Sequence, residues 1–202
     1  MKVAICISGQ TRTWEQNKDN IISNLFDCDH KIFTVTDVPL PGLIAERSLY
    51  VPELDLYKNK LAKFTAKSSG TNPNITNILK WMYKVYKCVQ LKRDYEVETG
   101  EDFDVVVRLR PDCTFTNKVK LRTTNNAIVL IGNREKDYLG GYCDQFWFSD
   151  SKTMDKISEI YLRINDYIDN NIIFHPETLL KHHCTTNSIS EERVDVDVNL
   201  IR

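Results

Sequence analysis

The residues most suited to chemistry follow a short apolar run in the middle of the chain, in the segment Arg108-Leu109-Arg110-Pro111-Asp112. The run itself, Val105 to Val107, is β-branched and suits a packed strand, which Pro111 should end because proline has no N–H and fixes φ. Guanidinium groups bind the paired oxygens of phosphates, and a carboxylate beside a diphosphate suits Mg²⁺ or Mn²⁺. The segment therefore predicts an anion site with Asp112 as a metal ligand. A salt bridge between Arg110 and Asp112 is the simpler alternative.

Two further strand patterns also end in polar residues. Val3 to Ile7 reads as a buried strand that breaks at a turn of small residues, and apolar residues from Trp14 to Phe26 then follow a helical spacing. Lys31 to Val38 reads as a second strand. The carboxyl ends of parallel strands share one edge of an open α/β sheet, where ligands bind, and a helix N-terminus attracts anions. The binding candidates gathered at this edge are Ser8, Gly9, Gln10, Arg12, Thr36, Asp37, Arg108 and Arg110.

Two more carboxylates suit sugar or acyl chemistry, as a base or as a stabiliser of positive charge. Asp144 follows a glycine pair in an aromatic strand pattern, and Glu177 follows Pro176 at a helix start. The helix dipole favours the ionised form of Glu177, although a plain first-turn glutamate is an equal alternative. With Arg110 as a stabiliser of the leaving group, Asp144 and Glu177 are the catalytic candidates. Weaker candidates for metal ligands are His175, His182 and His183. His182 and His183 are adjacent, and adjacent residues of a helix do not face one point.

Two Asp-x-Asp strings have unsuitable surroundings for a metal site. Asp102-Phe103-Asp104 precedes the central strand and should lie at the opposite edge of the sheet. Asp195-Val196-Asp197 falls inside a predicted strand, Val194 to Leu200, with both carboxylates on its exposed face. Three-letter matches are frequent by chance. The metal prediction therefore rests on Asp112.

The other patterns supply the elements that must position these residues. A long helix, capped by Asn74 or Thr76, should run to about Glu98 and end at Gly100. Most of its lysines indicate a solvated face, while Lys80 is assigned to cofactor binding. Strands that alternate with helices predict an α/β fold, with a Rossmann-like, mixed, mainly parallel β-sheet flanked by helices, as a single domain over residues 1–202. Further elements are expected at Ala127 to Ile131, a strand, and at Met154 to Ile168, a helix.

The composition is that of an ordinary globular protein. The 202 residues are 42% apolar and carry a formal net charge of −1, which gives no indication of nucleic-acid or membrane-surface binding. No apolar run reaches the ~20 residues of a membrane span, and the N-terminal apolar run is too short for a signal peptide. We therefore expect a cytoplasmic location and an unused sequon at Asn74-Ile75-Thr76. Six cysteines without CxxC spacing favour free thiols over three disulfides. Residues 40–73 read as loop-rich, with a weak helix near Glu53 to Phe64 and a candidate lid at Lys67 to Asn74.

Four segments in this order resemble small glycosyltransferases with the A-type fold, found in large DNA viruses of algae and in surface-polysaccharide gene clusters. They are Ala4 to Arg12, Arg108 to Asp112, Asp144-Gln145-Phe146 and His175-Pro176-Glu177. The resemblance implies a UDP-sugar donor, Mn²⁺ or Mg²⁺, a glycan or glycoprotein acceptor, and the host cytoplasm if the protein is viral. It also implies that the turn Ser8 to Arg12 and Thr36-Asp37 hold the nucleotide, while Asp144 and Glu177 face sugar and acceptor. The family's Asp-x-Asp motif corresponds here to Arg110-Pro111-Asp112, with arginine in the first acidic place.

Two other functions stay open at this point. A sugar-phosphate nucleotidyltransferase shares the sheet architecture but should carry a phosphate loop rich in glycine and lysine, whereas Ser8 to Arg12 has one glycine and no lysine. A non-catalytic sugar- or nucleotide-binding module would use aromatic side chains such as Trp81 and Trp147 for stacking, although core packing explains most of them equally well.

Overall fold

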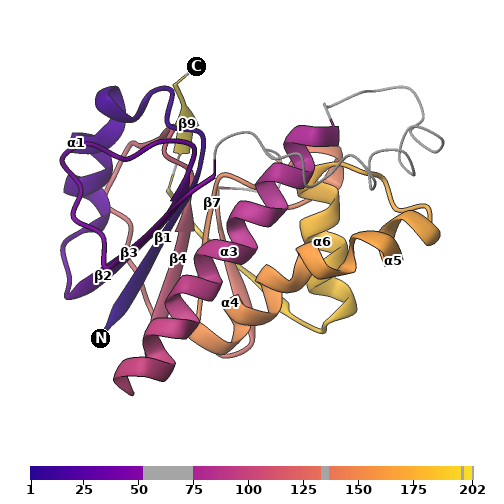
Figure 1. Cartoon of the computed structure of the whole chain (residues 1–202). Helices are drawn as coiled ribbons and strands as arrows, with labels where there is room; N and C mark the ends of the chain where they lie inside the picture. Colours follow the sequence, from indigo (N-terminus) through magenta and orange to yellow (C-terminus); the bar gives the residue numbers. More distant parts are fainter. Residues whose placement is uncertain (52–74, 133–136, 197, 202) are drawn as a thin grey trace.

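Two strands that are buried along almost their whole length form the centre of the sheet. The computed structural model describes residues 1–51, 75–132, 137–196 and 198–201 (Figure 1). Within it, β1 (Val3–Gly9) and β4 (Val105–Leu109) pair in parallel, with Ile5 opposite Val107. Parallel strands covered on both faces show continuous apolar runs rather than alternation, and these two segments have such runs.

These strands belong to a mixed, mostly parallel sheet, which has seven strands in the described part of the chain. Of the seven, only β7 runs antiparallel to its neighbours. The carboxyl ends of the other strands therefore meet the amino end of β7 at one edge of the sheet, called the carboxyl edge below. The order across the sheet is β3 (Arg47–Tyr50), β2 (His30–Thr36), β1, β4, β7 (Phe146–Ser149), β6 (Ala127–Ile131) and β8 (Ser190–Val194).

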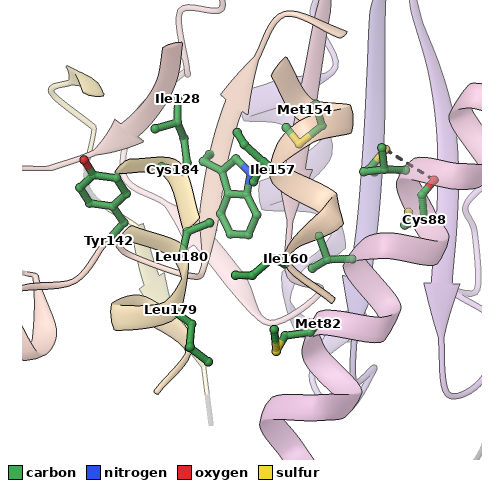
Figure 2. Packing of buried hydrophobic residues seen from close by; sticks show 14 of the residues in the cluster. Met82, Cys88, Ile128, Tyr142, Met154, Ile157, Ile160, Leu179, Leu180 and Cys184 are labelled. Atoms are coloured by element: carbon green, nitrogen blue, oxygen red, sulfur yellow. Dashed lines mark hydrogen bonds between the residues drawn. The ribbon is translucent and has the colours of Figure 1, made fainter. Parts of the chain in front are cut away.

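Alternate side chains of β1 face two apolar layers. Ala4 and Cys6 pack into the layer that contains α3 to α6, and Ile5 and Ile7 into the layer that contains α1. Figure 1 shows these helices on opposite sides of the sheet, and Figure 2 shows side chains of α3, α4 and α6 meeting in the first layer. The elements of the first layer are α3 (Ile75–Thr99), α4 (Ser151–Ser158), the 3-10 turn η4 (Glu159–Arg163), α5 (Ile164–Asp169) and α6 (Pro176–Thr186). The second layer holds α1 (Trp14–Leu25) and a two-stranded ribbon of β5 (Cys113–Phe115) and β9 (Val198–Leu200).

Most of the predicted elements are confirmed. The predicted strands beginning at Val3, Lys31 and Ala127 are β1, β2 and β6, and the short 3-10 turn η3 (Tyr138–Gly140) precedes the aromatic strand β7. Gly100 ends α3 as expected, because it adopts a φ of +67° and its N–H donates to the carbonyl of Glu96. The helix that starts at Pro176 also forms as predicted.

Three segments differ from the sequence prediction. The predicted strand Val194 to Leu200 is divided into β8 and β9, which belong to different sheets, so the string that starts at Asp195 does not lie within one strand. The predicted helix Met154 to Ile168 starts at Ser151 and is interrupted by η4. Strand β3 falls in a region expected to be loop.

Some expectations fall outside the described residues. The weak helix near Glu53 to Phe64 and the candidate lid at Lys67 to Asn74 are among them, as is residue 197. None of the described helices is long and apolar enough to cross a membrane. All six cysteines are free thiols, as predicted.

Candidate functional site

The loop after β1 and the loop after β4 meet at Gly9. Its φ is +151°, and a Cβ at this position would lie 2.9 Å from Cδ of Pro111 and 4.0 Å from Cγ of Arg110. Such a close approach and this φ both favour glycine. The contact brings the turn Ser8 to Arg12 against the segment Arg110 to Asp112, as the shared carboxyl edge predicts.

Asp37 holds the turn after β1 in place. The backbone N–H and the hydroxyl of Thr11 both donate to Oδ1 of Asp37, each at 3.0 Å. The hydroxyl of Thr36 donates to a backbone carbonyl two residues later, at 2.7 Å. Gln10 and Arg12 are exposed on the turn, and within the described chain neither side chain has a hydrogen bond or an ion pair. The turn is therefore fixed from one side and offers polar side chains on the other.

Lys84 of α3 also reaches the carboxyl edge, although its helix pattern indicated a solvated face. Its ammonium donates to the carbonyl of Gly9 at 2.9 Å, and the residue is only 6% exposed. Burial lowers the pKa of Lys84, Asp37 opposes this, and Lys80 adds to it. Lys80, one helical turn earlier, is half-buried. The helix thus supplies positive charge to the turn after β1.

Arg108 belongs to the core rather than to the surface of the site. It is fully buried, and its guanidinium donates to the carbonyl of Asp144 and to the hydroxyl of Ser8 (3.4 Å). The guanidinium carbon lies 4.5 Å from the ring centroid of Trp147 and 5.8 Å from that of Trp81. Burial lowers the pKa of Arg108 to about 10, so the side chain stays a cation at neutral pH. Arg108 therefore holds Ser8 and the backbone of Asp144 in place from the core.

Arg110 and Asp112 form the salt bridge that the sequence allowed as an alternative. Nε of Arg110 donates to Oδ1 of Asp112 at 2.9 Å, and Nη2 donates to Oδ2 at 2.6 Å. Nη1 lies 3.7 Å from Oδ2 of Asp144. Burial opposes the charge of Arg110, but the hydrogen bond to Asp112 and the charge of Asp144 outweigh it and raise the pKa. At 28% exposure, the Arg110 side chain is the most accessible of the three.

A glycine contact brings the loop before β7 onto the first turn of α6. A Cβ on Gly141 would lie 2.3 Å from the carbonyl carbon of Glu177, and the N–H of Tyr142 donates to the carbonyl oxygen of Glu177 at 3.0 Å. No side chain larger than hydrogen fits there without a shift of the backbone. Asp144 and Glu177, which are far apart in the sequence, therefore belong to one rigid corner of the site.

The carboxyl of Glu177 is buried and has a raised pKa. It is 9% exposed, and its Oε2 is buried without a hydrogen-bond partner. Burial, together with the charges of Asp144 and Asp137, raises the pKa of Glu177 to about 7. Nδ1 of His175 lies 3.8 Å from Oε2, while burial lowers the pKa of His175. The predicted effect of the helix dipole is therefore outweighed, and Glu177 can take or give a proton near neutral pH.

Glu177 lines a small pocket that is open to solvent. The pocket lies between the carboxyl end of β6, the loop before β7, the first turn of α6 and the segment between β8 and β9. Its walls mix apolar and polar groups, which suits a ligand with hydroxyl groups and a hydrophobic face. Besides Glu177, the lining residues include Ile131, Gly132, Cys143, Gln145 and Val196.

The residues at the carboxyl edge do not fit a metal ion in this arrangement. Both carboxylate oxygens of Asp112 are bonded to Arg110. Within residues 1–51, 75–132, 137–196 and 198–201, no group of three or more His, Cys, Asp or Glu side chains could hold a metal. The string that ends at Asp104 lies at the opposite edge, as predicted, where Asp104 accepts from the N–H of Lys2. The Mn²⁺ or Mg²⁺ expectation therefore stays a prediction.

The two adjacent histidines of α6 do not belong to the site. His183 is buried, with Nδ1 at 2.5 Å from the hydroxyl of Tyr167 and Nε2 at 2.8 Å from the carbonyl of Lys156. His182 packs edge-on against the same tyrosine, with ring centroids 5.6 Å apart. Both histidines therefore connect α6 to its neighbouring helices.

Comparison with known proteins adds no family assignment. No protein-family model matches the chain, and no curated protein matches it.

Proposed function

We propose that this protein is a glycosyltransferase with the A-type fold, which moves a sugar from a UDP-sugar donor to a glycan or glycoprotein acceptor. The observation that carries the proposal is Glu177, a buried carboxyl with an unpartnered oxygen, which lines a pocket at the carboxyl edge near the Arg110–Asp144 ion pair. Ligands of open α/β sheets bind beyond this edge. The ordered resemblance supports the same site.

The nucleotide would lie along the turn Ser8 to Arg12, which Asp37 fixes through Thr11. The guanidinium of Arg12 is exposed there and presents planar N–H donors that match phosphate oxygens. The diphosphate would then lie near Arg110, since the Gly9 contact brings the two loops together. The sugar would point toward Asp144 and the pocket.

These positions are compatible with transfer of the sugar to an acceptor hydroxyl. The oxygen of an acceptor hydroxyl forms a bond to the anomeric carbon of the donor sugar, and the bond between that carbon and the phosphate oxygen breaks. Its electron pair leaves with UDP, next to Arg110, which stabilises the developing negative charge. The hydroxyl proton passes to Glu177, whose pKa of about 7 suits a general base at neutral pH. The carboxylate of Asp144 would stabilise positive charge on the sugar ring.

The test is release of UDP from a panel of UDP-sugars, with and without glycan acceptors, by wild type and by Glu177→Gln. We expect the variant to lose about 100-fold or more in turnover, the range for removal of a general base, and to keep its affinity for UDP. Glu159→Gln, which also removes a glutamate from a first helical turn, is the matched control and should retain activity.

Two outcomes would contradict the proposal. Wild-type protein that binds UDP but releases none from any donor would be a binding module. Pyrophosphate release from UTP and a sugar phosphate would instead identify a nucleotidyltransferase.

A further inference from the structure

We infer that the donor diphosphate is bound by side-chain cations, namely Arg110 held by Asp112 and Lys84 held at Gly9, and that donor binding therefore needs no divalent metal ion. The inference rests on the proposed function and concerns only how its donor site neutralises charge. It assigns Asp112 as a positioning residue rather than as a metal ligand.

The salt bridge leaves one edge of the Arg110 guanidinium open. Asp112 occupies Nε and Nη2, so its carboxylate fixes the plane of the guanidinium. Nη1 has no hydrogen bond to any other described residue, and Oδ2 of Asp144 at 3.7 Å is beyond hydrogen-bond distance. A guanidinium locked along one edge loses little freedom when its other edge binds phosphate.

Lys84 is a buried cation that is only partly satisfied. An ammonium has three donors, and a single hydrogen bond is found here, to the carbonyl of Gly9. Burial of a charge is costly unless further partners compensate it. A phosphate at this edge would supply those partners, and the low-dielectric surroundings would strengthen the attraction.

Gly9 connects the two cations. Its carbonyl accepts from Lys84, and its Cα side faces Pro111 and the Cγ of Arg110. Both positive charges therefore border the same turn, on which Arg12 is exposed. The Arg110 cation contacts the carboxylates of both Asp112 and Asp144 and would repel a divalent ion from them.

The experiment measures UDP binding by calorimetry in EDTA and again with Mn²⁺. We expect similar affinity in both for the wild type. Arg110→Gln and Lys84→Gln should each weaken UDP binding by about 10- to 100-fold, the loss typical of one hydrogen bond to a charged group. Arg163→Gln removes an arginine from an exposed ion pair with Asp166 and should change nothing.

Asp112→Asn distinguishes a role of this carboxylate in positioning Arg110 from a role as a metal ligand. If Asp112 positions Arg110, the variant binds UDP more weakly in EDTA and Mn²⁺ gives no gain to either protein. Arg110→Lys, which keeps the charge but loses the planar fork, replaces Arg110→Gln if circular dichroism shows that the glutamine variant is unfolded. Its UDP affinity should fall below that of the wild type in EDTA.

The possible failures are distinguishable. Wild-type binding of UDP only in the presence of Mn²⁺ would overturn the inference and leave the proposed transferase intact. Unchanged affinity of the Arg110 and Lys84 variants would also overturn it. Absence of UDP binding under both conditions would overturn the inference together with the UDP-sugar proposal.

Discussion

Replacement of Glu177 by glutamine isolates the cost of holding an ionisable carboxyl in the pocket. Burial raises its pKa from 4.5 to about 7, so the folded state binds this proton more strongly than the unfolded state. The corresponding stabilisation is fully present below pH 4.5 and is lost as the pH rises through 7. Glutamine has no such proton, so the variant should gain stability relative to the wild type as the pH rises.

The size of the effect follows from the two pKa values. A rise from 4.5 to about 7 corresponds to at most ~3 kcal/mol at pH above 8. Because Glu177 lines a pocket that is open to solvent, water will relax around the charge, and we expect about 1–2 kcal/mol. For a chain of this length, that free energy raises the melting temperature by roughly 3–6 °C.

Thermal unfolding at pH 5, 7 and 8.5 measures this difference for wild type, Glu177→Gln and the control Glu159→Gln. The advantage of Glu177→Gln should be small at pH 5 and largest at pH 8.5, and the control should show no such trend. A Glu177→Gln variant that is less stable than the wild type at pH 8.5 would refute the reasoning, because the carboxylate would then be stabilised by its surroundings.

Two further predictions concern the supports of the site. Gly141→Ala should destabilise the fold by about 3 kcal/mol in urea unfolding, because the added Cβ overlaps the backbone of α6. Gly140→Ala meets open space and should cost only the ~1 kcal/mol of its positive φ, so equal losses in the two variants would refute the contact. Lys92→Met should lower the free energy of unfolding by about 3–5 kcal/mol, because it leaves Asp155 and Glu96 without their buried partner. The loss should be greater at pH 8 than at pH 5, and a loss below about 1 kcal/mol would show that these ion pairs add little stability.

The mixed, mainly parallel character of the sheet could be predicted because its central strands contain apolar runs. The positions of Arg110 and Asp112 followed from that layout, since a strand end fixes the edge at which its next residues lie. β3 has only four residues, which alternate between half-buried and exposed, so its sequence carries little signal. The division of the segment after Val194 depends on pairing with β5, a contact that a local pattern does not contain.

Sequence reasoning missed the burial of three charged side chains, Lys84, Lys92 and Arg108. Lys84, Cys88 and Lys92 are spaced four residues apart and form one buried row of α3. That spacing was a usable signal of burial, because free cysteine is among the most buried residue types and Cys88 lies in the same row as the two lysines. The burial of Arg108 had no local signal, since it depends on the carbonyl of Asp144 and on the ring of Trp147.

The packing of Arg108 against Trp147 and Trp81 gives the protein an intrinsic optical probe. The centroids of the two indole rings lie 6.3 Å apart, and the Arg108 guanidinium that contacts both rings donates to the backbone carbonyl of Asp144. The remaining tryptophan, Trp14, begins α1 directly after the turn that contains Arg12. Two of the three tryptophans therefore pack against Arg108, and the third follows the turn after β1, so a change in emission intensity on addition of UDP would report occupancy of the candidate donor site without any attached label.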